Sequence, residues 1–252
     1  RCGVEYFDYY LMHNVSGFSE KGFIDVDSFS FAKQKKEEGK IKKLGLSTHA
    51  NAEYLDNVLS QHPEMEFVQL QINYLDWENE GVESRKCVEI ANKYDLPILI
   101  MEPLKGGVLI NSPDSIQDEF KKFNPDKSIA SFALRFAASL DNVKIVLSGM
   151  RKMDDLVDNI DTFENFEVLS DEEHEFLKRM AKKLDENVAV PCSECGYCID
   201  ACPEMIPIPE YFTLYNISKN RPAEDIYRLY FDKLADEKVH AEECTYCGTF
   251  LD

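Results

Sequence analysis

The residues that most clearly predict a chemistry are cysteines near the C-terminal end of the chain. Residues 192–205 read CSECGYCIDACPEM, so four cysteines are separated by intervals of three, three and four, and a proline follows the last. A C-x2-C-x2-C-x3-C-P run holds iron–sulfur clusters, because its closely spaced thiolates surround one cluster and its fourth cysteine turns to another. The ligands predicted from this run are Cys192, Cys195, Cys198 and Cys202.

A shorter run, CTYCGTFLD, occupies residues 244–252. Cys244 and Cys247 begin it with the same spacing, but Phe250 stands where a third cysteine would fall. In the ligand pattern of bacterial ferredoxins, Cys202 would join Cys244 and Cys247 at a second cluster, and the first cluster would keep three cysteines. These cysteines are too few for two complete clusters, so either the clusters are incomplete or the chain is truncated or frame-shifted here. Zinc is the alternative, since C-x2-C pairs also bind it.

The chain has 252 residues and a formal net charge of −19, with 44% hydrophobic and 30% charged residues. This is the composition of a soluble globular protein, and its charge repels nucleic acid and anionic membranes. The one basic stretch, residues 33–43, has the pattern of a solvated helix end that runs into a strand. No apolar run is long enough to span a membrane, and the N-terminus is not a signal peptide. We expect a cytoplasmic protein whose cysteines bind metal rather than form disulfides.

Five short apolar runs alternate with stretches of helical periodicity, which predicts parallel strands covered by helices. The expected strands are residues 6–12, 42–47, 67–72, 97–101 and 143–148. The expected helices are residues 27–38, 52–60, 82–94, 127–140 and 153–163, and a further helix within 164–187 that begins with a capping box of Ser170 and Glu173. Such units fit an open doubly wound sheet or part of a (β/α)8 barrel. The absence of G-x-G-x-x-G after the strands weakens the first interpretation.

Polar or glycine residues follow every predicted strand. In a (β/α)8 barrel the carboxyl ends of the strands share one face, and that face carries the active site. The residues concerned are His13, Asn14, Ser47, Thr48, His49, Gln71, Asn73, Glu102, Lys105, Gly106, Gly107, Ser148, Gly149 and Arg151. Two of them have other interpretations, since Glu102 could be a buried, satisfied carboxylate and His49 an ordinary loop histidine.

Five motifs resemble the fourth to eighth strands of the aldo/keto reductase family, in the same order. They are DYYLMHN (8–14), LGLSTHAN (44–51), QINY (71–74), MEPLKGGVL (101–109) and SGMRKMDDLVDN (148–159). The chain is most similar to the branch of the family with a C-terminal 4Fe-4S ferredoxin-like domain. The resemblance implies an α/β fold of the (β/α)8 TIM barrel type, NADP(H) or NAD(H) as the cofactor, and reduction of carbonyl substrates by hydride transfer.

The resemblance also implies roles for the residues at the strand ends. His13 would be the catalytic residue that orients the substrate carbonyl. Ser47, Thr48 and Gln71 would hold the nicotinamide carboxamide, and Lys105, Gly106 and Gly107 would lie near the pyrophosphate. The adenosine end would be bound by Ser148, Gly149, Arg151, Asp158 and Asn159. Arg151 could pair with a 2′-phosphate, which would favour NADP, and an arginine that is simply exposed to solvent is the alternative.

The chain departs from the family pattern at its beginning. The catalytic tyrosine, aspartate and lysine of the family lie on its first three strand–helix units, whereas this chain starts with the fourth strand and so resembles an N-terminally truncated member. Residues 1–187 would form the barrel portion, about strands 4 to 8. Residues 188–252 would form a small α-helical ferredoxin-like domain, incomplete at its C-terminus, with one or two 4Fe-4S clusters.

The function expected from these observations is NAD(P)-dependent carbonyl reduction or alcohol oxidation, with an iron–sulfur electron-transfer tail. The partners would be a small-molecule carbonyl substrate and a redox partner protein, and neither nucleic acid nor a membrane. Two other interpretations stay open. The chain could be an iron–sulfur electron carrier with a non-catalytic barrel scaffold, or an inactive fragment, because half a barrel leaves sheet edges unpaired.

Overall fold

The centre of the molecule is a sheet of five parallel strands that lie in sequence order. The computed structural model describes residues 3–16, 20–186, 190, 192, 196–218, 234 and 240–248. The strands are β1 (Phe7–Met12), β2 (Ile41–Thr48), β3 (Val68–Gln71), β4 (Ile98–Met101) and β5 (Val143–Val146). All five strands predicted from the sequence are confirmed, with small differences at their ends.

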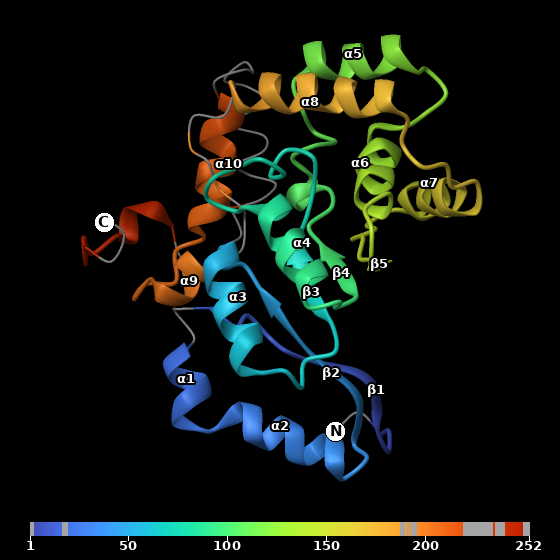
Figure 1. Cartoon of the computed structure of the whole chain (residues 1–252). Coiled ribbons are helices and arrows are strands. Elements are labelled where there is room, and N and C mark those ends of the chain that lie inside the picture. Colours follow the sequence, from blue (N-terminus) through green and yellow to red (C-terminus); the bar gives the residue numbers. More distant parts are fainter. Residues whose placement is uncertain are drawn as a thin grey trace.

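Helices connect and cover these strands (Figure 1). They are α1 (Glu20–Asp25), α2 (Ser28–Glu37), α3 (Ala52–Gln61), α4 (Ser84–Lys93), α5 (Asp114–Phe123), α6 (Ile129–Ala138), α7 (Met153–Glu164) and α8 (Asp171–Asp185). The six predicted helices are confirmed as α2, α3, α4, α6, α7 and α8, whereas α1 and α5 are additional. None of the helices in the described ranges is long and apolar enough to cross a membrane.

The strand order distinguishes the two predicted architectures. A doubly wound sheet reverses its strand order at a switch point, but here each strand pairs with its neighbour in sequence. This is the arrangement of consecutive strands in a barrel wall. The register places Met12 opposite Leu46 and Gln71 opposite Met101, so the carboxyl ends of neighbouring strands lie at one edge of the sheet.

Local sequence signals explain where several helices begin. The Asn51 side chain accepts a hydrogen bond of 2.9 Å from the Tyr54 amide and caps α3. The Ser128 hydroxyl caps α6 in the same way. Ser170 and Glu173 form the predicted capping box of α8, with hydrogen bonds in both directions. Each cap satisfies backbone groups that would otherwise lack a partner, and stabilises its helix by about 1 kcal/mol.

The backbone approaches closely where β2 meets the residue that precedes β3. Leu44, Leu46 and Phe67 are almost completely buried there. A Cβ atom on Gly45 would lie 2.5 Å from the carbonyl oxygen of Phe67 and 2.7 Å from its ring, so only glycine allows this approach. The ring of Tyr9 meets the Phe67 ring edge to face, with centroids 5.2 Å apart.

Helix α8 is fixed to α5 and α6 at one end of the molecule, as Figure 1 shows. Phe176 stacks on Phe123, with ring centroids 4.1 Å apart, and meets Phe120 edge to face. Arg135 of α6 donates two hydrogen bonds, of 2.6 and 3.0 Å, to the Glu173 carboxylate. This bidentate pair is almost fully shielded from water, which makes it stronger than an exposed ion pair.

The two outer strands each pair on one side only within the described part of the chain. Apolar side chains are exposed along both. On β1 these are Phe7, Tyr9 and Tyr10, and on β5 and α7 they are Ile145, Val157, Ile160 and Phe163. The sheet is therefore an open wall with two apolar margins rather than a closed barrel.

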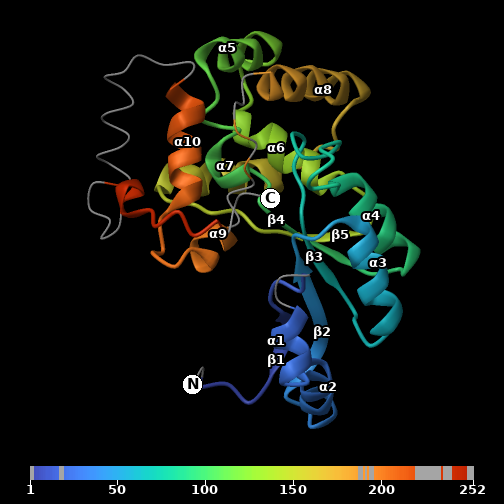
Figure 2. The ribbon, with the colours of Figure 1, turned by 90° about the vertical axis from the view of Figure 1, so that its left-hand side faces the viewer.

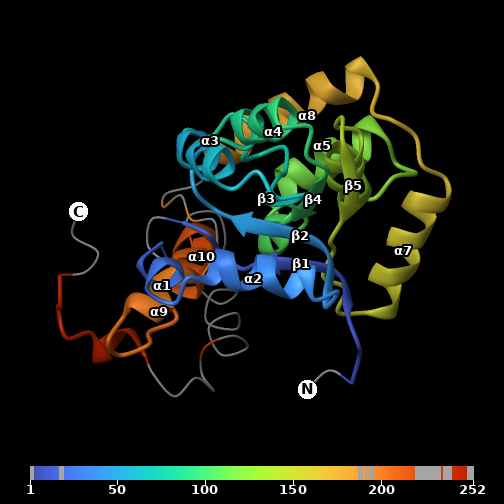
Figure 3. The same ribbon diagram turned by 60° about the horizontal axis from the view of Figure 1, so that its bottom comes forward.

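The cysteine-rich segment is described in part and contains α9 (Tyr197–Ala201), α10 (Ile208–Ser218) and the short 3-10 turn η2 (Ala241–Glu243). Figures 2 and 3 show α3 and α4 together beside β2 and β3, with α9 and α10 on the opposite side of these strands. Helices α9 and α10 thus lie beside strands that come much earlier in the sequence.

Candidate active site at the carboxyl ends of the strands

The ends of β1 and β2 are joined by hydrogen bonds. The Asn14 amide donates to the Ser47 hydroxyl over 2.9 Å, and the Val15 amide donates to the Ser47 carbonyl over 2.8 Å. Ser47 and Thr48 are buried, and His13 at the end of β1 is exposed. The loop that carries His13 is therefore attached to the strand that carries Ser47 and Thr48.

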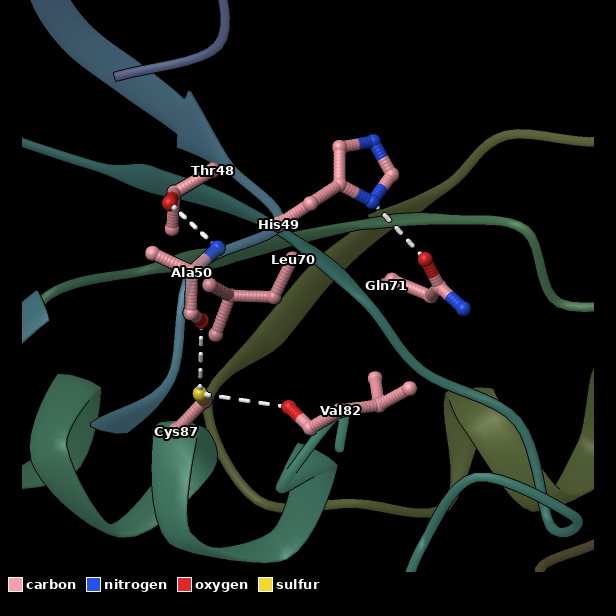
Figure 4. Close-up of a pocket in the computed structure, with 7 residues that line it drawn as sticks. All are labelled: Thr48, His49, Ala50, Leu70, Gln71, Val82 and Cys87. Atoms are coloured by element: carbon pink, nitrogen blue, oxygen red, sulfur yellow. Dashed lines mark hydrogen bonds between the residues drawn. The ribbon is translucent and has the colours of Figure 1, made fainter. Parts of the chain in front are cut away.

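Gln71, at the end of β3, is held at both ends of its amide. Its Oε1 lies 2.8 Å from His49 Nδ1, and its Nε2 donates over 2.8 Å to the carboxylate of Asp76 (Figure 4 shows the first bond). Because a carboxylate only accepts, the amide nitrogen must face Asp76 and the amide oxygen must face His49. His49 consequently donates from Nδ1.

The electrostatic state of His49 follows from its surroundings. Burial lowers the pKa of its imidazole, the hydrogen bond to Gln71 partly opposes this, and the nearby His13 lowers it further. The neutral ring, protonated at Nδ1, is the form that fits the network. The His49 ring is thus tied by a hydrogen bond to the end of β3.

Asp76 is the centre of the buried network, and its side chain is only 1% exposed. It accepts from Lys105 Nζ over 2.5 Å, from Gln71 over 2.8 Å and from Asn73 over 2.7 Å. Lys105 comes from the short turn η1 (Lys105–Gly107) after β4. Asp76 therefore links the end of β3 to the turn after β4. Sequence analysis did not select it, although its spacing from Asn73, whose side-chain oxygen accepts from the Asp76 amide, is the signal of a polar turn.

The turn after β4 is compact, and its residues are hydrogen-bonded to one another. Gly106 and Gly107 have φ values of 58° and 95°, a conformation that favours glycine. The Gly106 amide donates over 2.7 Å to the Glu102 carboxylate. Burial raises the pKa of Glu102, although the Gly106 and Lys105 contacts oppose this. Glu102 is thus a partly buried carboxylate with a partner, positioned on the turn predicted to approach a pyrophosphate.

The loop after β5 forms a separate small network. Asn159 donates to the Ser148 hydroxyl over 3.0 Å, and the Ser128 hydroxyl donates to Asp158 over 2.7 Å. The Arg151 amide donates to the Asp155 carboxylate, while the Arg151 residue is exposed. Ser148 and Asn159 are therefore in contact, whereas Asp158 accepts from the N-cap residue of α6.

A small cavity of about 10 Å³ lies beside Gln71, large enough for about one water molecule (Figure 4). Its lining residues are Thr48, His49, Ala50, Leu70, Gln71, Val82 and Cys87. The Cys87 thiol faces the carbonyl oxygens of Ala50 and Val82 at 3.8 and 3.9 Å. Burial raises the pKa of this thiol to about 12, so Cys87 is a packed thiol and not a nucleophile.

The cysteine-rich segment contains a second, larger cavity of about 240 Å³. Its lining residues are Cys202, Ile206, Ile208, Tyr211, Phe212, Ala241, Cys244, Thr245 and Cys247. The Ala241 amide donates to the Tyr211 hydroxyl over 2.9 Å and fixes one wall. Within the described ranges, no three histidine, cysteine or carboxylate side chains are grouped tightly enough to hold one metal ion. Cys192 and Cys198 are half-buried, and Cys195 lies outside the described residues.

The two sites are connected by an aromatic contact. The ring of Tyr197, at the start of α9, meets the His49 ring edge to face, with centroids 5.4 Å apart and an interplanar angle of 76°. Tyr197 lies between Cys195 and Cys198 in sequence. The first cysteine run is therefore in contact with the hydrogen-bonded network of Gln71 and Asp76.

Comparison with known proteins identifies the family. The sequence profile described as "Aldo/keto reductase family" matches residues 1–182. Similar solved structures include aldo-keto reductases from Klebsiella pneumoniae (18% identity, TM-score 0.52), Bacillus halodurans (19%, 0.53) and Brucella melitensis (20%, 0.53). They match 70–71% of this chain, which spans only 59–62% of theirs. No curated protein is significantly similar to the chain. The profile match covers most of the sequence, and the chain therefore belongs to the aldo/keto reductase family.

Proposed function

We propose that the chain takes part in NAD(P)-dependent carbonyl reduction or alcohol oxidation and that its tail carries an iron–sulfur cluster. The observation that carries the first part is the polar network of His49, Gln71, Asp76 and Lys105 at the carboxyl ends of parallel strands. Active sites of barrels lie at this edge. Among the similar structures, one from Klebsiella pneumoniae was solved with NADPH and another with NADP and acetate.

A nicotinamide cofactor supplies the hydride in this chemistry, and the residues of the chain would bind and orient it. Ser47 and Thr48 offer hydroxyls, and Gln71 an amide, for the carboxamide. Ser47 Oγ already accepts from the Asn14 amide, so its proton is available for donation to a carboxamide oxygen. Asp76 would fix the orientation of Gln71, because its carboxylate determines which end of the amide faces His49.

The remaining binding positions belong to the glycine turns. Lys105, Gly106 and Gly107 would lie near the pyrophosphate. The Lys105 ammonium is paired with Asp76 and the Gly106 amide with Glu102, so a phosphate would have to displace one of these acceptors. Ser148, Gly149 and Arg151 would bind the adenosine end, with Asp158 and Asn159 behind them. An exposed guanidinium at Arg151 suits a 2′-phosphate, so we propose NADPH over NADH.

His13 would be the catalytic residue of this chain and orient the substrate carbonyl. The tyrosine, aspartate and lysine of the family pattern belong to strand–helix units that this sequence does not match. The roles proposed for the residues of this chain are therefore cofactor and substrate positioning. Its partners would be a small carbonyl compound and a redox protein of the cytoplasm.

Nicotinamide binding tests the first part of the proposal. Calorimetric titration of the purified, anaerobic chain should detect NADPH binding, and Gln71→Ala should weaken it. Gln69→Ala, two residues earlier on β3, is the matched control and should leave the affinity unchanged. Arg151→Ala should weaken NADPH binding at least about tenfold and NADH binding little, since a hydrogen bond to a charged group is lost. An intact chain that binds iron but neither nucleotide would instead be an electron carrier.

The second part rests on the tail. We propose that residues 188–252 form the iron–sulfur domain, with Cys192, Cys195, Cys198, Cys202, Cys244 and Cys247 as ligands. The support is the cavity that gathers cysteines from both runs. Its position next to the strands, through Tyr197 and His49, favours a tail that serves the nicotinamide site. Iron and sulfide analysis after anaerobic purification tests this, and stoichiometric zinc in place of iron would contradict it.

A further inference from the structure

The side-chain amide of Gln71 is held in one orientation by groups on both sides. Its oxygen accepts from His49 Nδ1 over 2.8 Å, and its nitrogen donates to Asp76 over 2.8 Å. An amide oxygen can accept twice and an amide nitrogen can donate twice. Within the described part of the chain, one lone pair and one N–H of Gln71 thus remain for a ligand. A carboxamide complements them, because it also carries one acceptor and one donor side.

The His49 ring is in turn held by the tail. Tyr197 meets it edge to face, with ring centroids 5.4 Å apart and an interplanar angle of 76°. This T-shaped arrangement is one of those that aromatic rings favour, so it restricts how the imidazole can rotate. A rotation would carry Nδ1 away from Gln71. The contact with Tyr197 therefore stabilises the ring orientation that donates to the amide.

A second tyrosine occupies the equivalent position in the other cysteine run. Tyr197 belongs to the sequence CGYC and Tyr246 to CTYC, each directly before the last cysteine. Tyr246 is 92% exposed, however, whereas Tyr197 is half-buried and contacts His49. The two tyrosines thus share their place beside cysteines but not their surroundings. An effect specific to Tyr197 must come from its position at the strand ends.

We propose that Tyr197 is a positioning residue for the nicotinamide carboxamide and acts through His49 on the Gln71 amide. This inference rests on the nicotinamide site proposed above and specifies how the tail serves it, whichever metal the tail holds. The nearby His13 also lowers the pKa of His49, so the contact lies close to the proposed catalytic residue as well. Because coupling between two sites is reciprocal, bound nucleotide should in turn hold α9 against the strands.

The first test compares the two tyrosines in the full chain by calorimetric titration with NADPH. Tyr197→Ala should weaken binding about three- to tenfold, the effect of one neutral hydrogen bond lost or misaligned. Tyr197→Phe keeps the ring and should bind like the parent. Tyr246→Ala is the matched control, since it removes the same side chain beside a cysteine, and it should also bind like the parent. Equal metal content and equal circular dichroism of these proteins show that the cysteine runs and the fold are intact.

Two further titrations locate the effect at the nicotinamide end. Adenosine 2′,5′-bisphosphate has the adenosine end of NADPH but no nicotinamide, so parent and Tyr197→Ala should bind it equally. A variant with a generally damaged site would lose affinity for both ligands. Gln71→Ala completes a double-mutant cycle for NADPH. Because Tyr197 acts through Gln71, Tyr197→Ala should weaken NADPH binding little further in that background.

A measurement without nucleotide checks the ring contact itself. Burial lowers the pKa of His49, and the Tyr197 ring is one of its neighbours. The pKa of His49, followed by NMR, should therefore rise in Tyr197→Ala, because the imidazole becomes more accessible to water. It should stay at the parent value in Tyr197→Phe and in Tyr246→Ala. An unchanged pKa of His49 in Tyr197→Ala would show that the two rings are not in contact in solution and would overturn the inference.

The NADPH titrations separate failure of this inference from failure of the proposed function. If the parent and Tyr197→Ala bind NADPH equally, the positioning role is wrong and the proposed nicotinamide site stands. If Tyr197→Ala binds more tightly, α9 obstructs the site instead of supporting it, and the inference is again wrong. A folded parent that binds no NADPH would contradict the proposed function, and the inference with it.

Discussion

The Lys105 ammonium lies 2.5 Å from the Asp76 carboxylate, and both side chains are almost completely buried. This ion pair joins the turn after β4 to the end of β3. The same carboxylate also accepts a hydrogen bond from the Gln71 amide. A buried ion pair adds little stability compared with well-packed apolar residues, but removal of one partner leaves an uncompensated charge.

Asp76→Ala should therefore destabilise the protein by about 3–5 kcal/mol, measured as the free energy of unfolding in urea. Asp76→Leu combined with Lys105→Met should recover part of this loss, because neither charge is then buried alone, although the Gln71 amide still lacks its acceptor. Glu175→Ala, which breaks the exposed pair with Lys178, is the control and should cause no measurable change. A single variant as stable as the parent would show that Lys105 has another partner.

His49 should make the stability of the protein depend on pH. Burial lowers its pKa below the usual value of 6.5 in the folded state, so the unfolded chain binds a proton that the folded chain resists. Stability should be fully present above pH 6.5 and fall as the pH decreases below it. His49→Asn keeps a donor for Gln71 but does not titrate, so its midpoint of urea unfolding should vary less between pH 7 and pH 5. If the midpoint of urea unfolding changed equally with pH in the parent and in His49→Asn, this assignment would be contradicted.

Glu102 should oppose nucleotide binding if the proposed pyrophosphate position is right. Its carboxylate already accepts the hydrogen bond that the Gly106 amide could give to a phosphate, and its negative charge repels a phosphate. Burial raises the pKa of Glu102, so NADPH affinity should increase as the pH falls through this raised pKa and the charge disappears. Glu102→Gln should bind NADPH more tightly at neutral pH and lose that part of the pH dependence. Calorimetry at several pH values measures both effects, and weaker binding by Glu102→Gln would mean that the carboxylate itself supports the site.

Gly45→Ala should destabilise the core by about 1–3 kcal/mol, because a Cβ atom would collide with the backbone oxygen and ring of Phe67. Gly22→Ala is the matched control. Gly22 lies in helix α1 with no atom within 4 Å of an added Cβ, so alanine should stabilise by up to about 1 kcal/mol. Thermal unfolding of both variants gives the comparison. A midpoint for Gly45→Ala equal to that of the parent would imply that β2 and β3 can move apart.

The strands and most helices were predictable because their signals are local. Apolar runs of a few residues and capping side chains such as Asn51 and Ser170 are visible without the fold. Helix α5 was harder to predict, since Ile116, Phe120 and Phe123 are its only apolar residues and the others are charged or polar. Its stability comes from α8, whose Phe176 is far away in the sequence.

The site was predictable only in part, for a different reason. The sequence shows which polar residues follow the strands, but it does not show which polar groups satisfy one another. Lys105 was expected near a pyrophosphate, and its ammonium is instead paired with Asp76, 29 residues earlier. The contact of Tyr197 with His49 joins even more distant residues, so only the folded chain reveals it.

The aromatic margin of β1 has a practical consequence for the isolated polypeptide. Phe7, Tyr9 and Tyr10 are 40–56% exposed beside a row of backbone groups with no neighbouring strand in the described part of the chain. Such a border acts as a template for another extended chain. Preparations should consequently self-associate as the concentration rises, and a soluble peptide that adds a strand to β1 should keep the protein dispersed.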